Sequence, residues 1–300
     1  MKKVIVMMIL MLGLLAACGS NEENNQSENA DKAEVTKAFT IGVIPAQTEG
    51  EIEEAMNRLQ AELSEKLDRE VEISTFPDYN GVVEAMNYNQ IDMAYFGPLT
   101  YVIAHEKSGA QAIVTQLIDG EPFYHSYVIT NAENEWETLD EFLAESDQNS
   151  FAFGDPNSTS GSLIPSIELQ DRGVFEDQEN NDFKSVTYTG SHDATALSVQ
   201  NKQVDAGAID SAIYNQLVES GKVDGDQLKV IWESEKLFQY PWAVSKDTDE
   251  ETITKLQDAF LSIEDETILN AFGASGFTKA SNDDYESIRK AAEKQGLLEE

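Results

Sequence analysis

Apolar strands and helices alternate twice along this chain, and this repetition limits the possible folds more than any other feature. The segment "AFTIGVIP", residues 38–45, is typical of a buried strand, and apolar residues recur at helical spacing after it. The helical face consists of Ile52, Ala55, Met56, Leu59, Leu63 and Leu67. Further strands are expected at 71–77, 91–97 and 111–118, with helices between them. This alternation indicates an α/β fold with largely parallel strands.

A second series follows residues 124–131 and has the same order of elements. Its strands are expected at 151–153, 185–190, 204–209 and 228–234, with helices at 139–144 and 193–202 and from 158 and 211. Residues 240–247 return towards the first series, and helices at 250–263, 266–272 and 283–295 close the chain.

The two series contain a short internal repeat. "NQIDMAYFG", residues 89–97, aligns with "KQVDAGAID", residues 202–210, and each follows an apolar helix and ends in a short strand. A chance match is the alternative, because the repeat is short. Two equivalent units predict two α/β lobes, 38–129 with 240–300 and 130–239, with a ligand cleft at the carboxyl ends of their strands.

The N-terminus is typical of a secretory signal. Lys2 and Lys3 precede an apolar run over 4–15, and "LAAC" ends at Cys18. A cysteine directly after a small-residue cleavage site resembles the bacterial lipobox, which implies a signal peptide over 1–17 and a lipid on Cys18; a chance cysteine is the alternative. Residues 18–37 are polar and are expected to form a disordered tether. We therefore expect a protein outside the cytoplasm, anchored by lipid to the outer face of the cell membrane.

The charge balance excludes one class of partner. The chain has 56 acidic and 20 basic residues, a net charge of −36, so a basic face for nucleic acid cannot be assembled. Cys18 is the only cysteine, and no His or Cys pair has metal-ligand spacing. The sequence therefore predicts no disulfide, no metal and no cofactor.

The segment "GDPNSTSG", residues 154–161, is the strongest candidate for a binding site. It follows an apolar strand and precedes a helical pattern. Ser158, Thr159 and Ser160 offer hydroxyls where the first N–H groups of the helix are unpaired. Together with the helix dipole these groups favour an anion without any Lys or Arg. Ordinary N-capping by one hydroxyl is the alternative.

Longer motifs around this segment resemble the PhnD-like family of phosphonate, phosphite and phosphate substrate-binding proteins of ABC transporters. The matching motifs are "GDPNSTSGSLIP", "PDYNGVVEAMNYNQIDMAYFGP", "GSHDATALSVQNKQVDAGAIDS" and "VIWESEKLFQYPWAV", and the resemblance spans 39–277. It implies a two-lobe periplasmic-binding-protein fold of type II, with crossings near Tyr127–Asn131 and Phe238–Trp242. It also implies a monomeric binding protein, not an enzyme, that delivers a small phosphorus oxyanion to an ABC permease and its ATPase.

The resemblance assigns roles to individual residues. The oxyanion is expected on Ser158, Thr159 and Ser160, with His192 as a further donor. Tyr79 and Tyr95 of the first lobe are expected to close over it, although a core role for either ring is the alternative.

Asp210 bears on which anion is chosen. A carboxylate beside an oxyanion is repulsive unless a proton lies between them, so Asp210 favours ligands with a P–OH over sulfate-like ones. A helix N-cap is its alternative role. Relatives that take aminoalkylphosphonates carry an extra acid near the second crossing, where this chain has Tyr240. We therefore expect phosphite, methylphosphonate or phosphate before aminoethylphosphonate.

Three other functions remain open at this stage. Ser158, His192 and Asp210 are the residue types of a hydrolytic triad, but there is no Gly-x-Ser-x-Gly motif. The same fold also serves nitrate, sulfonates and thiamine precursors, and Asp210 argues against the first two. A receptor that reports its ligand to a sensor kinase would need the same binding site as an importer.

Overall fold

The computed structural model describes residues 37–47 and 52–298. The predicted signal peptide, Cys18 and the tether as far as residue 36 lie outside this part of the chain. Within the described residues, no helix combines the length and the apolar character needed to cross a membrane.

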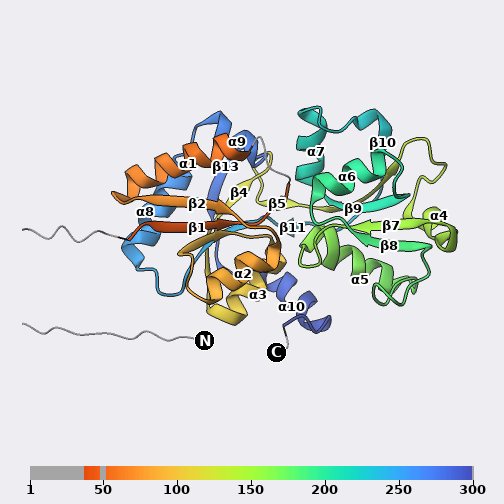
Figure 1. Ribbon diagram of the computed structural model, residues 1–300, viewed down its shortest axis with the longest axis horizontal. Helices are drawn as coiled ribbons and strands as arrows, with labels where there is room; N and C mark the ends of the chain where they lie inside the picture. The colour runs from red at the N-terminus through yellow and green to blue at the C-terminus, as the bar shows by residue number, and fades with distance from the viewer. Residues whose placement is uncertain (1–36, 48–51, 299–300) are drawn as a thin grey trace, which may run out of the picture. The chain divides into compact units, whose positions relative to one another are not determined.

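The first lobe is built on a six-stranded sheet with helices on both faces (Figure 1). The strand order is β13-β4-β12-β3-β1-β2. The strands are β1 (Phe39–Val43), β2 (Val71–Thr75), β3 (Met93–Tyr95), β4 (Gln111–Leu117), β12 (Pro241–Val244) and β13 (Gly276–Lys279). The helices are α1 (Ile52–Leu67), α2 (Tyr79–Asn87), α3 (Pro98–Ser108), α8 (Glu250–Leu261), α9 (Glu266–Ala271) and α10 (Glu286–Lys294), with a 3₁₀ turn at Asn282–Tyr285. Helix α1 packs with α8 and α9, and α2 packs with α3.

The second lobe is built on a five-stranded sheet of order β10-β6-β9-β7-β8. Its strands are β6 (Ser126–Asn131), β7 (Ser150–Phe153), β8 (Ser185–Tyr188), β9 (Ala206–Asp210) and β10 (Leu228–Glu233). Its helices are α4 (Leu139–Leu143), α5 (Ile164–Asp171), α6 (His192–Gln200) and α7 (Ser211–Glu219), with 3₁₀ turns at Ser146–Gln148 and Gly225–Gln227. A π-helical turn, Thr159–Leu163, leads directly into α5.

The two sheets are mixed, so the expectation of largely parallel strands was wrong. Strands β2, β1 and β3 are parallel, as are β8, β7 and β9, but the remaining pairs are antiparallel. The reason is that β6 and β12 enter each sheet from the other lobe and run against their neighbours. Strands β3 and β9, which contain the two halves of the internal repeat, each have one parallel and one antiparallel neighbour, so they occupy equivalent positions in the two sheets.

The chain passes between the lobes through a small sheet. Strands β5 (Phe123–Tyr124) and β11 (Leu237–Phe238) pair antiparallel there. The first crossing therefore precedes the predicted Tyr127–Asn131, because residues 126–130 are already paired with β9 in the second lobe. The second crossing includes Phe238, as predicted, but it ends before β12, so Trp242 lies in the sheet of the first lobe and not in the crossing.

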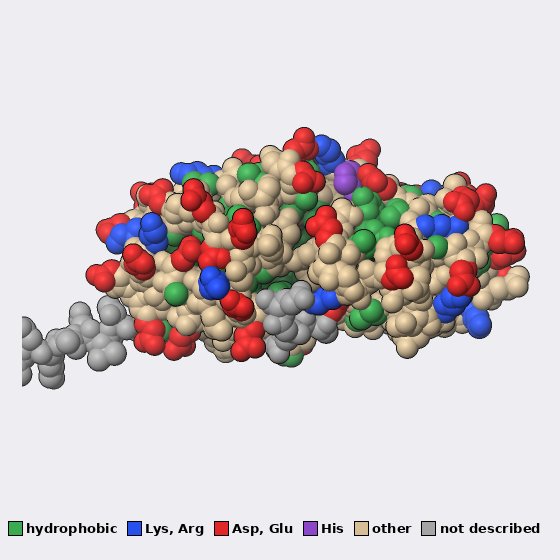
Figure 2. Space-filling view, turned by 90° about the horizontal axis from the view of Figure 1, so that it is seen from above, with side chains coloured by type: hydrophobic (Ala, Val, Ile, Leu, Met, Phe, Trp, Pro, Cys, Tyr) green, Lys and Arg blue, Asp and Glu red, His purple; other side chains and the backbone are tan. Residues whose placement is uncertain are grey.

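Acidic side chains are scattered over the visible surface, with fewer basic ones between them (Figure 2). The ion pairs of the described residues lie on the outside; in Lys202–Glu133, for example, the two side chains are 54% and 78% exposed. Such exposed pairs contribute little to stability.

Candidate functional site

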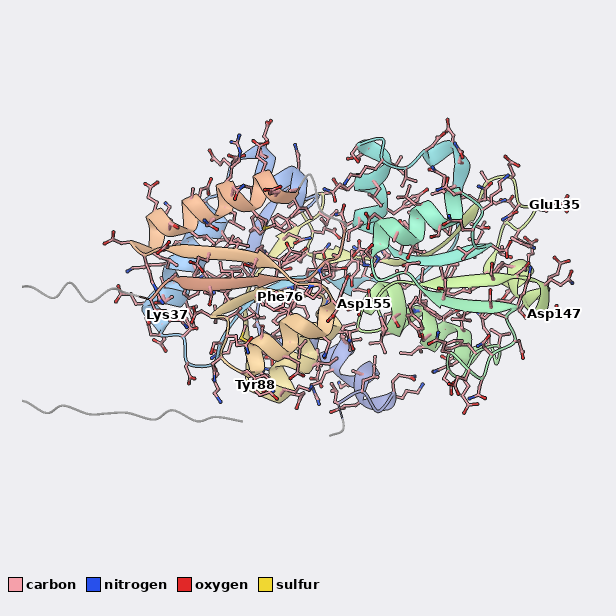
Figure 3. All side chains as sticks on the ribbon, viewed as in Figure 1. Lys37, Phe76, Tyr88, Glu135, Asp147 and Asp155 are labelled. Atoms are coloured by element: carbon pink, nitrogen blue, oxygen red, sulfur yellow. The ribbon has the colours of Figure 1, made fainter. Side chains whose placement is uncertain are left out.

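The predicted anion segment forms a tight turn between β7 and the π-helical turn. Ser158 is the N-cap, and its Oγ accepts a hydrogen bond from Gly161 N–H at 3.0 Å. The Gly154 N–H donates to the Gly161 carbonyl at 2.8 Å and closes the turn. The Asp155 carboxylate accepts from Asn157 N–H at 2.7 Å, and it lies close to the backbone N–H of Tyr79 in the first lobe. Asp155 lies where the two lobes meet (Figure 3).

Two of the predicted site residues also join the lobes. The Leu99 N–H, at the start of α3, donates to Thr159 Oγ1 at 2.7 Å. The His192 N–H, at the start of α6, donates to the Ala46 carbonyl at 3.0 Å. The site is therefore assembled from helix N-termini of both lobes, which is where unpaired N–H groups and positive dipole ends are found.

Three buried hydroxyls at this junction have no hydrogen-bond partner among the described residues: Tyr79 Oη, Tyr124 Oη and Ser160 Oγ. Tyr124 Oη lies close to Ser160 and Thr159, and Tyr79 Oη close to Ser158, without full hydrogen-bond geometry. A buried hydroxyl without a partner is unfavourable by about 1–3 kcal/mol. Three such hydroxyls at the junction of the two lobes indicate hydrogen-bond donors that are arranged for a ligand.

His192 is held as a neutral donor. Its ring is buried, and burial lowers the pKa of the imidazole to about 4. Its Nδ1 accepts from Asp210 N–H at 3.3 Å, which leaves the proton on Nε2. Nε2 lies 3.1 Å from Tyr240 Oη and donates to it.

Asp210 is the acid at the centre of the site. It caps α7, and its Oδ1 accepts from Ala212 N–H at 2.7 Å and Ile213 N–H at 3.0 Å. Burial nevertheless raises the pKa of this carboxyl to about 7, while these bonds and one from Tyr240 oppose the rise. Near neutral pH Asp210 can therefore accept or share a proton.

The effect of the negative charge of Asp210 on the pKa values of tyrosines shows which phenols lie near this carboxyl. It adds to burial in raising the pKa of Tyr79, Tyr95, Tyr124 and Tyr240. These four tyrosines, together with the half-buried Tyr127, thus lie within electrostatic reach of one carboxyl.

The predicted Tyr95 lies near the site, but its hydroxyl is already used. It donates to Gln116 Oε1 at 3.0 Å, and its ring packs 5.6 Å from the ring of Tyr240 and 4.9 Å from that of Trp242. Sequence reasoning missed Tyr124, whose hydroxyl is free. The residue lies in the two-residue strand β5 and belongs to no motif with helical or strand periodicity.

The site is rich in neutral donors and has no cation. No Lys or Arg is among the buried residues of the described chain. Within the same residues, no cluster of three His, Cys, Asp or Glu side chains could hold a metal ion. Hydroxyls, an imidazole N–H and helix dipoles can bind an oxyanion, and Asp210 can accept its proton.

Ser158, His192 and Asp210 are not connected as a hydrolytic triad. The His192 ring faces the backbone N–H of Asp210 and the hydroxyl of Tyr240. His192 Nε2 carries a proton, so it cannot act as a base that takes a proton from Ser158. The Ser158 Oγ accepts its hydrogen bond from Gly161 N–H instead.

Comparison with known proteins gives consistent results. The family model of the ABC transporter, phosphonate, periplasmic substrate-binding protein matches residues 41–285. The phosphonates-binding periplasmic protein of Escherichia coli K12 is 30% identical over 280 residues, which cover 89% of this chain and 80% of the relative. The phosphate-import protein PhnD of Mycolicibacterium smegmatis is 30% identical over 257 residues, 83% of this chain and 78% of the relative. The structure of PhnD1 from Prochlorococcus marinus in complex with methylphosphonate has a TM-score of 0.78 and 26% identity, and the match covers 87% of this chain and 99% of that one.

Proposed function

Because the chain belongs to the family of periplasmic substrate-binding proteins of phosphonate ABC transporters, we propose that it captures a small phosphorus oxyanion outside the cytoplasm and delivers it to an ABC importer. The observation that carries the proposal is the set of three unpartnered hydroxyls, Tyr79, Tyr124 and Ser160, near the buried carboxyl of Asp210. Members of this family bind and release a solute, so we assign no catalytic step.

In the proposed complex the oxygens of the anion accept from both lobes. Ser158, Thr159 and Ser160 provide the N-terminal hydroxyls of the second lobe, Tyr79 provides a phenol of the first, and Tyr124 provides a phenol from β5 between the lobes. His192 Nε2 donates to the anion directly or through Tyr240. Because these bonds join the lobes, the ligand favours the arrangement in which they are in contact.

Asp210 selects the protonation state of the ligand. A P–OH group donates to this carboxyl, whereas fully ionised sulfate has no proton to offer and is repelled. Burial raises the pKa of Asp210 to about 7, so the carboxyl can share a proton with a P–OH group near neutral pH, and its rejection of sulfate should be strongest above pH 7, where it is ionised.

The preferred ligands are phosphite, methylphosphonate and phosphate. Tyr240 occupies the position near the second crossing where an acid could hold an ammonium group. Among the described residues that line the adjoining cavity, Asp210 is the only carboxyl. The methylphosphonate complex of the Prochlorococcus marinus relative also supports a small uncharged substituent.

Calorimetric titration of the purified protein tests this function. We expect binding of phosphite, methylphosphonate or phosphate and no binding of sulfate. Ser160→Ala and Asp210→Asn should weaken binding about 10- to 100-fold, as for hydrogen bonds to charged groups. Ser198→Ala is the matched control, because Ser198 Oγ donates to the Ala194 carbonyl within α6. Failure of all these anions to bind, or equal effects of Ser160→Ala and Ser198→Ala, would contradict the proposal.

We also propose that a lipid on Cys18 anchors the protein to the outer face of the cell membrane. The support is the apolar run followed by "LAAC". Cys18→Ser should release the protein into the medium or leave an unprocessed precursor, and it should abolish labelling by radioactive fatty acid. Labelling that survives the substitution would rule the anchor out.

A further inference from the structure

A small cavity adjoins the anion site: Asp210 and Tyr240 line it, whereas the serines and the threonine of the serine-rich turn do not. Its volume is about 30 Å³, and its walls include Tyr95, Asp210 and Tyr240. Apolar side chains of both lobes, such as Ile213 and Phe272, make up much of the rest. A cavity needs roughly 10–15 Å³ on this measure to hold one water molecule, so this one has room for about two non-hydrogen atoms.

One wall of this cavity carries an unused donor. The Gln239 side chain is buried, and its Oε1 accepts from Tyr240 N–H at 2.8 Å. This bond fixes the orientation of the amide, since the nitrogen could not accept from that N–H. Its Nε2 then has no hydrogen-bond partner among the described residues.

The second glutamine of the same wall shows the contrast. Gln116 Oε1 accepts from Tyr95 Oη at 3.0 Å, and its Nε2 donates to the Phe272 carbonyl at 3.4 Å. Both ends of Gln116 are therefore used within the protein. The third glutamine that lines the cavity, Gln47, donates from Nε2 to Gln216 Oε1 at 2.8 Å. Among the described glutamines of this cavity, Gln239 Nε2 is therefore the amide donor that remains for a ligand.

We infer that this cavity receives the substituent on phosphorus, and that Gln239 donates to a hydrogen-bond acceptor on that substituent. The inference rests on the proposed function, because it requires the phosphorus oxyanion to occupy the adjoining site. The cavity size admits one-carbon and two-atom substituents, and the apolar walls favour uncharged ones. The free amide N–H then distinguishes a hydroxymethyl group from an ethyl group of the same size. An aminomethyl group is disfavoured, because its ammonium would face an N–H donor.

The ligand series that tests this inference needs no variant. Calorimetric titration of the purified wild-type protein would compare phosphite, methylphosphonate, ethylphosphonate, hydroxymethylphosphonate and aminomethylphosphonate. We expect hydroxymethylphosphonate to bind about three- to tenfold more tightly than ethylphosphonate, because it satisfies the Gln239 donor. Equal binding of the two, or tighter binding of ethylphosphonate or aminomethylphosphonate, would overturn the inference.

A variant assigns the preference to the residue. Gln239→Met keeps the length of the side chain but removes the amide, so the preference for hydroxymethylphosphonate over ethylphosphonate should disappear. The affinity for phosphite, which has no substituent, should not change. Gln116→Met is the control and should keep the preference. Loss of phosphite binding in folded Gln239→Met would place the amide in the anion site and refute the assignment. If no phosphorus oxyanion binds the wild type, the proposed function itself fails.

Discussion

Buried hydroxyls without hydrogen-bond partners contribute to ligand binding but not to the stability of this protein. Tyr79 and Tyr124 each hold a phenol away from water with no acceptor in the described chain. Such groups lower the stability of the folded protein and gain their hydrogen bonds only from a ligand. Residues used for binding should therefore respond to substitution in the opposite way to residues used for folding.

Tyr79→Phe and Tyr124→Phe test this separation. Each removes an unsatisfied hydroxyl, so the free energy of unfolding should stay the same or rise. Affinity for the phosphorus oxyanion should fall about 10- to 100-fold, because one hydrogen bond to a charged ligand is lost. Urea unfolding and calorimetric titration measure the two quantities.

Tyr101→Phe is the matched control for these variants. The Tyr101 hydroxyl donates to Asn282 Oδ1 at 2.6 Å and accepts from Ala112 N–H at 3.2 Å. Its removal should lower stability by about 1 kcal/mol and leave affinity unchanged. If Tyr79→Phe and Tyr124→Phe behave like this control, their hydroxyls do not bind the ligand.

The buried Asp210 should give the ligand-free protein a specific dependence on pH. Its folded-state pKa, about 7, lies above its ordinary value of 3.8. Its contribution to stability is therefore complete below about pH 4 and is lost as the pH rises through 7. His192, whose folded-state pKa is lowered to about 4, acts in the opposite direction and loses its contribution as the pH falls from 6.5 towards 4.

Asp210→Asn isolates the carboxyl from the histidine. Asparagine keeps an oxygen for the N–H groups of Ala212 and Ile213 but does not titrate. The free energy of unfolding of the variant minus that of the wild type should increase between pH 5 and pH 8 by on the order of 2 kcal/mol. Urea unfolding without ligand at both pH values measures this difference. A constant difference would mean that Asp210 ionises in the folded protein as it does in water.

At the scale of elements, the sequence predicted the helices and longer strands but not their directions. Periodicity and the internal repeat located β3 and β9, because apolar alternation is a local property. Strands β5 and β11 have two residues each and were missed, since their pairing depends on the two crossings meeting in space. The same limit explains why Tyr124 and Gln239 were missed. Gln239 lies within the quoted segment 230–244, but the local pattern does not show that its side chain faces the cavity, and tertiary contacts alone bring both residues to the site.

The serine-rich turn depends on one glycine that is needed for close packing. A Cβ on Gly161 would lie 2.9 Å from Ser158 Oγ, 3.1 Å from His192 Cε1 and 3.2 Å from Gly154 Cα. Gly161→Ala should therefore lower the free energy of unfolding by about 1–3 kcal/mol and weaken all ligands. Gly154→Ala in the same turn is the control, because its nearest contact would be an ordinary 3.4 Å. Similar losses in both variants would show that the turn adapts to either side chain.

At the scale of the whole molecule, binding depends on contacts that join the lobes away from the ligand. Gln216 on α7 accepts at Oε1 from Gln47 Nε2 at 2.8 Å. Its own Nε2 lies 2.5 Å from the Asn270 carbonyl and 3.1 Å from that of Ala271, and donates to both. The Gln216 side chain of the second lobe thus forms hydrogen bonds with two segments of the first lobe. These bonds favour the form in which the lobes are joined and the binding site is complete.

Gln216→Ala should therefore weaken every ligand by the same factor, about two- to tenfold, without changing their order of affinity. The reason is that each ligand binds to the form with joined lobes. A smaller fraction of this form raises the dissociation constant of every ligand by the same factor. Calorimetric titration with phosphite and methylphosphonate measures the factor, and small-angle scattering measures the separation of the lobes. Gln257→Ala is the matched control, since Gln257 Nε2 donates to the Ile113 carbonyl within the first lobe. A change of ligand order in Gln216→Ala, or an equal loss in Gln257→Ala, would show that Gln216 does not act through the equilibrium between the lobes.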